Sequence, residues 1–281
     1  MPFYQIVKNK LLLIFLLIED YAMYETFNIR MSKLNRNRDI TVYLPDDYYN
    51  SDMYYPVLYI QDGQNAFFDE LSYSGVSWGF GDYASSHNLK IIMVAIPCNF
   101  EGEKRNDEYG PWIISREITL RETGKDIVIG GEGVLYIEWI VEELKPFIDH
   151  KYRTIVGDTS MIGSSSGATI TSYACFRYPT IFRKVANLST AYWFYWDEFK
   201  ELIESSDLSS VEKFYMDVGG HENDHDLEIN QWYKDVNDYI YSLIKDKISN
   251  IEYRYFEDAH HNEWEWRQRL PHIMEYLYGG K

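Results

Sequence analysis

The chain has 281 residues and a formal net charge of −17, and 46% of its residues are hydrophobic, including the aromatic residues that make up 17% of the chain. Disordered chains are poor in apolar and aromatic residues, so this composition excludes that class. Nucleic acids and anionic membranes attract clustered lysine and arginine, and the acidic balance argues against both as partners. The length fits one large domain or two smaller ones and leaves enzymes, binding modules and scaffolds open.

The N-terminal 20 residues combine two lysines with an apolar run, Leu11–Ile18, that ends at two acidic residues. The order of charge and apolar run is that of a signal peptide, but a small-residue cleavage site is missing. The run is also far shorter than the roughly 20 residues of a membrane-spanning helix. We expect residues 1–20 to be a leader or extra segment of unclear role, and residues 21–281 to form a single domain. A cytoplasmic location is expected, with secretion as the alternative.

Apolar, β-rich runs alternate with longer segments of helical periodicity along the rest of the chain. The predicted strands are Phe27–Met31, Ile40–Leu44, Val57–Ile60, Ile91–Ile96, Thr159–Ile162, Lys184–Leu188, Lys213–Val218 and Ile251–Phe256. The predicted helices are Val134–Asp149, Ala168–Tyr178, Asp197–Glu204, Leu227–Ile244 and Asn262–Leu277. This alternation indicates a mostly parallel sheet with helices on both faces. The first strands lack helices between them and should form an antiparallel edge.

Two other features complete this outline. The segment Cys98–Gly133 is rich in glycine and charge and has no strong periodicity, so we expect a long insertion near a functional site. Cys98 and Cys175 are the two cysteines, too few for a disulfide framework, and we expect both to be free and buried.

A candidate nucleophile lies in the G-x-S-x-G sequence Gly163–Gly167, between an apolar strand and a helix. In such a turn the central serine, Ser165, is lifted above the sheet in strained backbone geometry. The N–H of Ser166, at the helix start, can then donate to the oxyanion of a tetrahedral intermediate. Five-residue matches also occur by chance, and the alternative is a turn without chemistry.

The acid and the histidine of a serine hydrolase of this kind should follow the serine in that order. Glu222 and Asp224 come directly after a predicted strand, and both are candidates for the acid. His260 and His261 lie between the last strand and the last helix, and only one of these neighbours can face Ser165.

Three further polar residues or groups have structural or alternative interpretations. Asn262 should cap the last helix, and His272, inside that helix, is expected at the surface or in packing. A metal site is an alternative for the stretch after the seventh strand, with ligands at near-helical spacing from His221, Glu222, His225 and Asp226. Nothing else in the sequence calls for a metal, and we expect neither a metal nor a cofactor.

With these parts in place, the chain resembles the putative-esterase family of α/β-hydrolases over Tyr24–Tyr278. The resemblance is carried, in order, by RDITVYLPDDY, YPVLYIQDGQNAFFD, KRNDEYGPW, GEGVLYIEWIVEELKPFIDHKYRT, MIGSSSGA and HNEWEWRQRLP. It implies an α/β-hydrolase fold and a triad of Ser165, His261 and Glu222. It also implies an oxyanion hole from the backbone of Ser166 and Gln64.

The function predicted in this way is hydrolysis of carboxylic (acyl) esters through a Ser-His-acid triad and an acyl-enzyme intermediate. The alternatives are an acyltransferase with the same triad and a non-catalytic module that binds carbohydrate or another ligand. Tyr109, Trp112 and Trp193 are predicted to line the substrate site, although each could instead be a core or surface aromatic. The expected partner is a small-molecule ester, and the oligomeric state is open, with a homodimer as one alternative.

Overall fold

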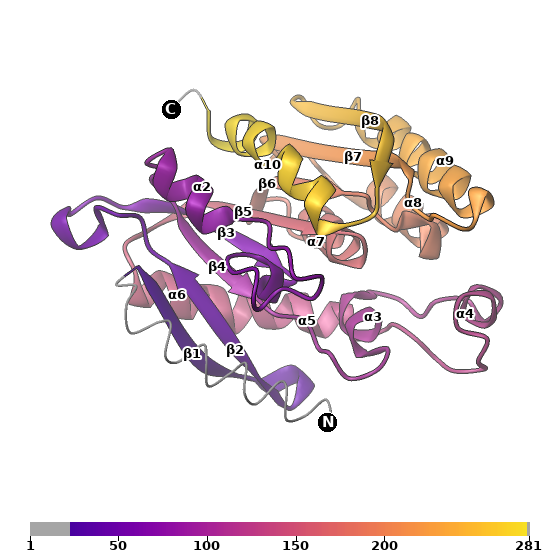
Figure 1. The fold of residues 1–281 in the computed structure, drawn as a ribbon, viewed down its shortest axis with the longest axis horizontal. Coiled ribbons are helices and arrows are strands. Elements are labelled where there is room, and N and C mark those ends of the chain that lie inside the picture. Colours follow the sequence, from indigo (N-terminus) through magenta and orange to yellow (C-terminus); the bar gives the residue numbers. More distant parts are fainter. Residues whose placement is uncertain (1–22, 280–281) are drawn as a thin grey trace.

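The computed structural model describes residues 23–279, so the predicted leader lies outside the described residues. These residues form an eight-stranded sheet in the order β1-β2-β4-β3-β5-β6-β7-β8 (Figure 1). The strands are β1 (Tyr24–Met31), β2 (Arg36–Tyr43), β3 (Tyr55–Gln61), β4 (Ile92–Ile96), β5 (Thr154–Ser164), β6 (Phe182–Leu188), β7 (Lys213–His221) and β8 (Ile251–His260). All eight predicted strands are present. The pairs β1–β2 and β2–β4 are antiparallel and the other pairs are parallel, which confirms the predicted antiparallel edge.

The helices that were predicted from periodicity are also present. The α-helices are α2 (Phe80–Ser86), α3 (Lys104–Tyr109), α4 (Arg116–Thr123), α5 (Gly133–Trp139), α6 (Lys145–Lys151), α7 (Ser166–Arg177), α8 (Trp196–Ser205), α9 (Leu227–Ile244) and α10 (Glu263–Tyr278). A wider π-helical turn, Ile140–Leu144, joins α5 to α6 where one continuous helix was predicted. Pro146, which cannot donate a backbone hydrogen bond, follows this turn and accounts for the local change.

The insertion contains two helices that periodicity did not predict. Ser115 Oγ accepts a hydrogen bond from the N–H of Ile118 at the start of α4, and Gly124 ends that helix with φ 67°. The helices α3 and α4 have six and eight residues, too few for an apolar repeat to emerge. For α4, the capping residues Ser115 and Gly124 were the available signal.

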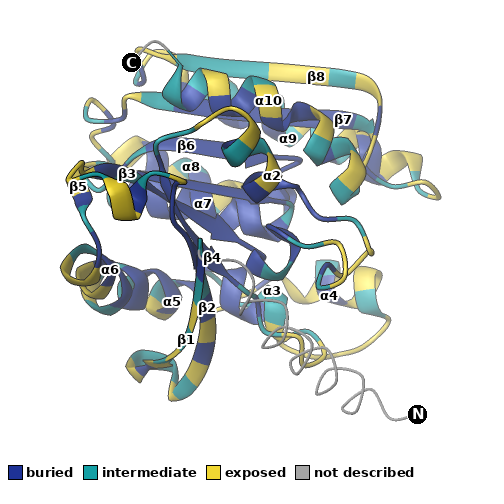
Figure 2. Cartoon of the chain, turned by 60° about the vertical axis from the view of Figure 1, so that its left-hand side comes forward, coloured by how far each residue is buried: buried dark blue, intermediate teal, exposed yellow. Residues whose placement is uncertain are grey.

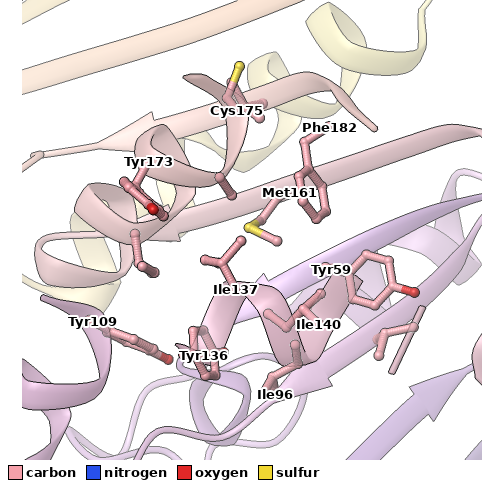
Figure 3. Packing of buried hydrophobic residues seen from close by; sticks show 14 of the residues in the cluster. Tyr59, Ile96, Tyr109, Tyr136, Ile137, Ile140, Met161, Tyr173, Cys175 and Phe182 are labelled. Atoms are coloured by element: carbon pink, nitrogen blue, oxygen red, sulfur yellow. The ribbon is translucent and has the colours of Figure 1, made fainter. Parts of the chain in front are cut away.

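Alternating side chains of the sheet enter two cores. Val57 and Tyr59 of β3 belong to a cluster that includes residues of α5, α6, α7, α8 and α9, whereas Leu58 and Ile60 pack with α2 and α10. Figure 3 shows part of the first core, where the rings of Tyr109 and Tyr136 lie 5.6 Å apart. The two clusters confirm the predicted cover of helices on both faces.

The sheet is most deeply buried at its centre, and Figure 2 shows exposed residues along the edge strand β8. Because β3 to β8 run parallel, their carboxyl ends share one edge, and the segments that leave this edge hold the polar residues discussed below. Cys98 and Cys175 are free and buried, as expected. No helix within residues 23–279 is long and apolar enough to cross a membrane.

Candidate active site

The turn from β5 into α7 holds Ser165 in a strained conformation, with φ 56° and ψ −127°. A positive φ is costly for a residue with a side chain and is kept where the surroundings enforce it. Here the Ser165 N–H donates to the Leu188 carbonyl at 2.9 Å. A Cβ at Gly163 would collide with the carbonyl of Gly167, and a Cβ at Gly167 would lie 2.8 Å from Asp62 Oδ2. The motif's two glycines are therefore required by close packing, and Ser165 itself stays partly exposed.

The residue after Ser165 opens helix α7. The first N–H groups of a helix have no acceptor within the helix and carry its partial positive charge. Ser166 is the first residue of α7, and its hydroxyl donates to Asn106 Oδ1 at 2.9 Å. The side chain is thus held by the insertion, and the backbone N–H of Ser166 is the group that the predicted oxyanion hole would use.

The loop after β3, which carries Gln64, is fixed against the end of β4. Gly63 packs so closely on the backbone of Ile96 that a Cβ there would collide with it. The Gln64 side chain accepts from the Cys98 N–H at 3.2 Å and contacts Cys98 Sγ at 3.6 Å. Its side-chain amide group is therefore bound to Cys98. This agrees with the prediction that Gln64 contributes its backbone N–H, and not its side chain, to an oxyanion hole.

Arg105, a residue that sequence reasoning did not single out, joins this loop to the serine turn. Its guanidinium donates to both carboxylate oxygens of Asp62, at 2.7 and 2.8 Å, and lies 3.5 Å from the carbonyl oxygen of Ser164. Burial disfavours the charged guanidinium, but the Asp62 carboxylate outweighs this effect and raises the pKa of Arg105. The insertion thus supplies a positively charged side chain that contacts both the loop after β3 and the serine turn. The available signal was the arginine at the start of RNDEYGPW.

His261 and Glu222 form a largely buried pair after β8 and β7. His261 Nδ1 lies 2.5 Å from Glu222 Oε2, and the other carboxylate oxygen accepts from the Gly219 N–H. The Glu222 side chain is fully buried, and that of His261 is 23% exposed. If Nδ1 carries the proton that it shares with the carboxylate, the acceptor lone pair of the neutral ring is on Nε2.

The alternative candidates form a second pair beside the first. His260 Nδ1 lies 2.7 Å from Asp224 Oδ1, but these side chains are 47% and 63% exposed. The ring of His260 stacks on that of His221 at 4.9 Å. Each candidate histidine therefore has its own candidate acid, and only one of the pairs is buried.

The four residues of the alternative metal site do not converge. Glu222 is engaged by His261 and Gly219, and Asp226 caps α9 by accepting from the N–H groups of Glu228 and Ile229. The carboxylates that the alternative needed are thus committed to other partners.

Two structural predictions near the end of the chain are confirmed. The Asn262 side chain accepts from the N–H of Glu265 and caps α10. His272 is a packing residue, because its Nε2 lies 2.7 Å from Glu252 Oε1 and its ring contacts Tyr215.

The three aromatic residues predicted at the substrate site differ in their exposure. Tyr109 is fully buried, and its hydroxyl accepts from the Asp62 N–H at 2.8 Å. Trp112 is half-buried against Tyr173 and Phe199, and Trp193 is 6% exposed. Tyr109 also lines a small hollow next to Ser166, together with Asn106, Gly110, Ile114, Thr169, Phe194 and Tyr195. Contact of these aromatics with substrate stays a prediction.

A mostly parallel sheet with a strained serine turn after β5, and with a histidine–carboxylate pair after β8 and β7, defines the chain as an α/β-hydrolase. The chain belongs to the family described as Putative esterase, whose model matches residues 31–277, and it is accordingly a hydrolase of the esterase class.

Known proteins with a similar sequence or structure cover most of the chain. The uncharacterized protein YbbA of Bacillus subtilis is 25% identical over 256 residues, which are 86% of this chain and 93% of YbbA. The structure of an IroE-like serine hydrolase from Shewanella oneidensis has a TM-score of 0.71 at 17% identity, covering 90% of this chain and 78% of that one. The siderophore hydrolase EstB from Aspergillus nidulans has a TM-score of 0.68 at 17% identity, covering 91% and 96%. At these identities the structures show a shared fold.

Proposed function

We propose that the protein hydrolyses carboxylic esters with Ser165 as nucleophile, His261 as general base and Glu222 as the acid of the triad. The observation that carries this proposal is the part-buried hydrogen bond between His261 Nδ1 and the fully buried carboxylate oxygen Glu222 Oε2. It orients the imidazole and leaves Nε2 as the atom that can take a proton from Ser165. The strained turn that presents Ser165 supports the same assignment.

In the first half-reaction, Ser165 Oγ attacks the ester carbonyl carbon while its proton passes to His261 Nε2. Glu222 stabilises the imidazolium that forms. The negative charge on the former carbonyl oxygen is met by the backbone N–H groups of Ser166 and Gln64, which the clamp between Arg105 and Asp62 holds in place. The C–O bond to the alcohol breaks, and the alcohol leaves with the proton from His261.

Water then completes the reaction by the same route. His261 takes a proton from a water molecule, whose oxygen attacks the acyl carbon bound to Ser165. The bond to Oγ breaks, the proton returns to Oγ, and the carboxylic acid is released. A small-molecule ester is the proposed substrate, because the predicted aromatic contacts of Trp112 and Trp193 suit an apolar acyl group better than a charged one.

The test is hydrolysis of p-nitrophenyl esters of increasing acyl length, with one siderophore ester included because a structural neighbour is a siderophore hydrolase. We expect Ser165→Ala to lower kcat by about 10⁴-fold or more. The matched control is Ser164→Ala in the same turn, which should keep kcat within about tenfold.

Three outcomes would decide against the proposal. Equal turnover by wild type and Ser165→Ala would remove the nucleophile, and no wild-type turnover of any ester would favour a non-catalytic module. An acyltransferase would instead form a new ester from an added alcohol at the expense of the free acid.

A further inference from the structure

The proposed base has a further neighbour besides its acid, the indole of Trp266 in the first turn of α10. The rings of His261 and Trp266 lie nearly perpendicular, with their centroids 5.0 Å apart and an interplanar angle of 82°. Asn262, directly after His261, accepts from the N–H of Glu265 with its side chain and from the N–H of Trp266 with its carbonyl. The cap that begins α10 therefore also places Trp266 beside the base.

The indole of Trp266 is itself anchored by a hydrogen bond. Its Nε1–H donates to Ser189 Oγ at 3.0 Å, and this hydrogen bond is buried. Trp266 is 5% exposed, and its ring also lies 5.8 Å from that of Trp78. A buried indole N–H can only donate, and leaving it without an acceptor is costly. The hydroxyl of Ser189 therefore helps to determine where the indole lies.

Ser189 is a rigid support for this contact. It is fully buried directly after β6, and its backbone has a positive φ of 49°. Its N–H donates to the carbonyl of Asp217 in β7 at 3.0 Å. The Asp217 carboxylate in turn accepts from the Tyr215 hydroxyl at 2.9 Å and from Arg269 Nη1 at 2.6 Å. A positive φ at serine is kept only where the surroundings enforce it, and here the neighbouring strand does so.

A single hydrogen bond does not fix the plane of an imidazole ring. The contact between His261 Nδ1 and Glu222 Oε2 holds one ring atom, and the ring can still tilt about that atom. Packing restricts such a tilt, and the His261 ring is contacted by Trp266 and by Tyr233 of α9, whose ring centroid is 5.5 Å away. Trp266 combines this packing with an anchored position.

We propose that Ser189 and Trp266 are positioning residues, which hold the plane of the His261 ring so that Nε2 stays aligned with Ser165 Oγ. The Ser189 hydroxyl fixes the indole, and the indole limits the tilt of the imidazole. This inference rests on the proposed function, because it concerns the proposed base. Proton transfer depends on the alignment of donor and acceptor, so a loosened ring should affect the chemical step more than the binding of the ester.

The experiment compares wild type with Ser189→Ala, which removes the acceptor of the indole N–H. The indole should then move toward another acceptor, and the imidazole loses a fixed neighbour. For p-nitrophenyl ester hydrolysis we expect kcat and kcat/KM to fall together by about tenfold, with KM changed less than about twofold. This pattern is that of an interaction that serves the transition state. Thermal melting checks that the variant is folded at the assay temperature.

A second measurement does not depend on turnover. The ring current of Trp266 shifts the NMR signals of the His261 ring C–H protons, and these signals are assigned by their loss in His261→Ala. In Ser189→Ala we expect them to broaden and to move toward the chemical shifts of free histidine, because the two rings no longer keep one arrangement. A mere loss of stability would lower the melting temperature without moving these signals in the folded protein.

Ser172→Ala is the matched control, because it removes another buried serine hydroxyl. Ser172 lies in α7, is fully buried and donates to Asn187 Oδ1 at 2.9 Å. Its loss should destabilise the protein to a similar degree, leave kcat within about twofold of wild type and leave the His261 signals unchanged.

Trp266→Phe tests whether Ser189 acts through the indole. Phenylalanine keeps an aromatic ring but has no N–H for Ser189 to accept, so we expect kcat to fall at least as far as in Ser189→Ala. Adding Ser189→Ala to Trp266→Phe should then change kcat by less than about twofold, because the hydrogen bond is already absent.

The results separate this inference from the proposed function. Unchanged kcat or unchanged His261 signals in Ser189→Ala, or losses that multiply in the double variant, would overturn the positioning role and leave the proposed function unaffected. Full turnover by His261→Ala or Ser165→Ala would overturn the proposed function, and the positioning role with it.

Discussion

Two histidine–carboxylate pairs lie side by side where β7 and β8 end, and burial is what distinguishes them. The inner pair joins His261 to Glu222, whose side chain is fully buried and receives a second hydrogen bond from Gly219. The outer pair joins His260 to Asp224, and about half or more of each of those side chains is exposed. Water screens an exposed pair and leaves its geometry loose, whereas a buried pair keeps its orientation and its electrostatic strength. The pairing of a histidine with a carboxylate therefore has, at one place, the fixed geometry that the proposed triad needs, and at the other it is a surface contact.

The largest expected effect comes from replacing each of the two histidines singly by alanine. His261→Ala should lower kcat for p-nitrophenyl ester hydrolysis by about 10⁴ to 10⁶-fold, because it removes the group that carries the proton. His260→Ala should keep kcat within about fivefold. An active His261→Ala enzyme together with an inactive His260→Ala enzyme would assign the base to the outer pair.

The carboxylates should show the next largest difference. Glu222→Gln keeps an acceptor and the side-chain length but removes the charge that stabilises the imidazolium, so kcat should fall by about 10³ to 10⁴-fold. Asp224→Asn, the corresponding change in the outer pair, should alter kcat less than about threefold. Thermal melting of both variants checks that each is folded. Similar losses of kcat in the two variants would mean that burial does not determine which carboxylate serves in catalysis.

The sequence predicted the parts of this comparison that depend on local patterns. Continuous apolar runs indicated the strands, and the glycine spacing around Ser165 indicated the serine turn. The choice between Glu222 and Asp224 was different, because the residues are two positions apart in one polar stretch and pattern alone left both open. Only the family resemblance favoured Glu222. Which carboxylate is buried depends on how α9 and β8 pack around the stretch, and that is a tertiary property.

Tyr233 and Tyr109 also show that local sequence patterns do not determine where a buried side chain lies relative to the active site. Tyr233 occupies the buried face of α9 with Ile229, Asn237 and Ile240, so its spacing is that of an ordinary core position. Tyr109, whose contact with substrate stays a prediction, is fully buried, because α3 folds the insertion back against α5 and α7. Periodicity identifies an inward-facing residue, but it does not indicate whether that residue meets the core or the active site.

A pair of arginine–aspartate contacts extends the comparison beyond the histidines. Arg105 and Asp62 form a two-point contact with 2.7 and 2.8 Å bonds, and Asp62 is 7% exposed. Arg116 and Asp126 form the same contact with two 2.8 Å bonds, but both side chains are more than 60% exposed. The two contacts have nearly the same geometry. Any difference in their effect on activity should therefore come from their burial and from their distance from the active site.

The smallest expected effect comes from replacing Arg105 and Arg116 singly by lysine. Arg105→Lys keeps the charge but loses the planar two-point contact that fixes Asp62 next to Gln64. We expect kcat/KM to fall about tenfold, because small misplacement of the oxyanion donors weakens transition-state binding. Arg116→Lys should leave kcat/KM unchanged. If both variants kept full activity, a positive charge at position 105 would be enough to hold Asp62 for catalysis. The difference between buried and exposed pairs would then apply to the histidines and not to the arginines.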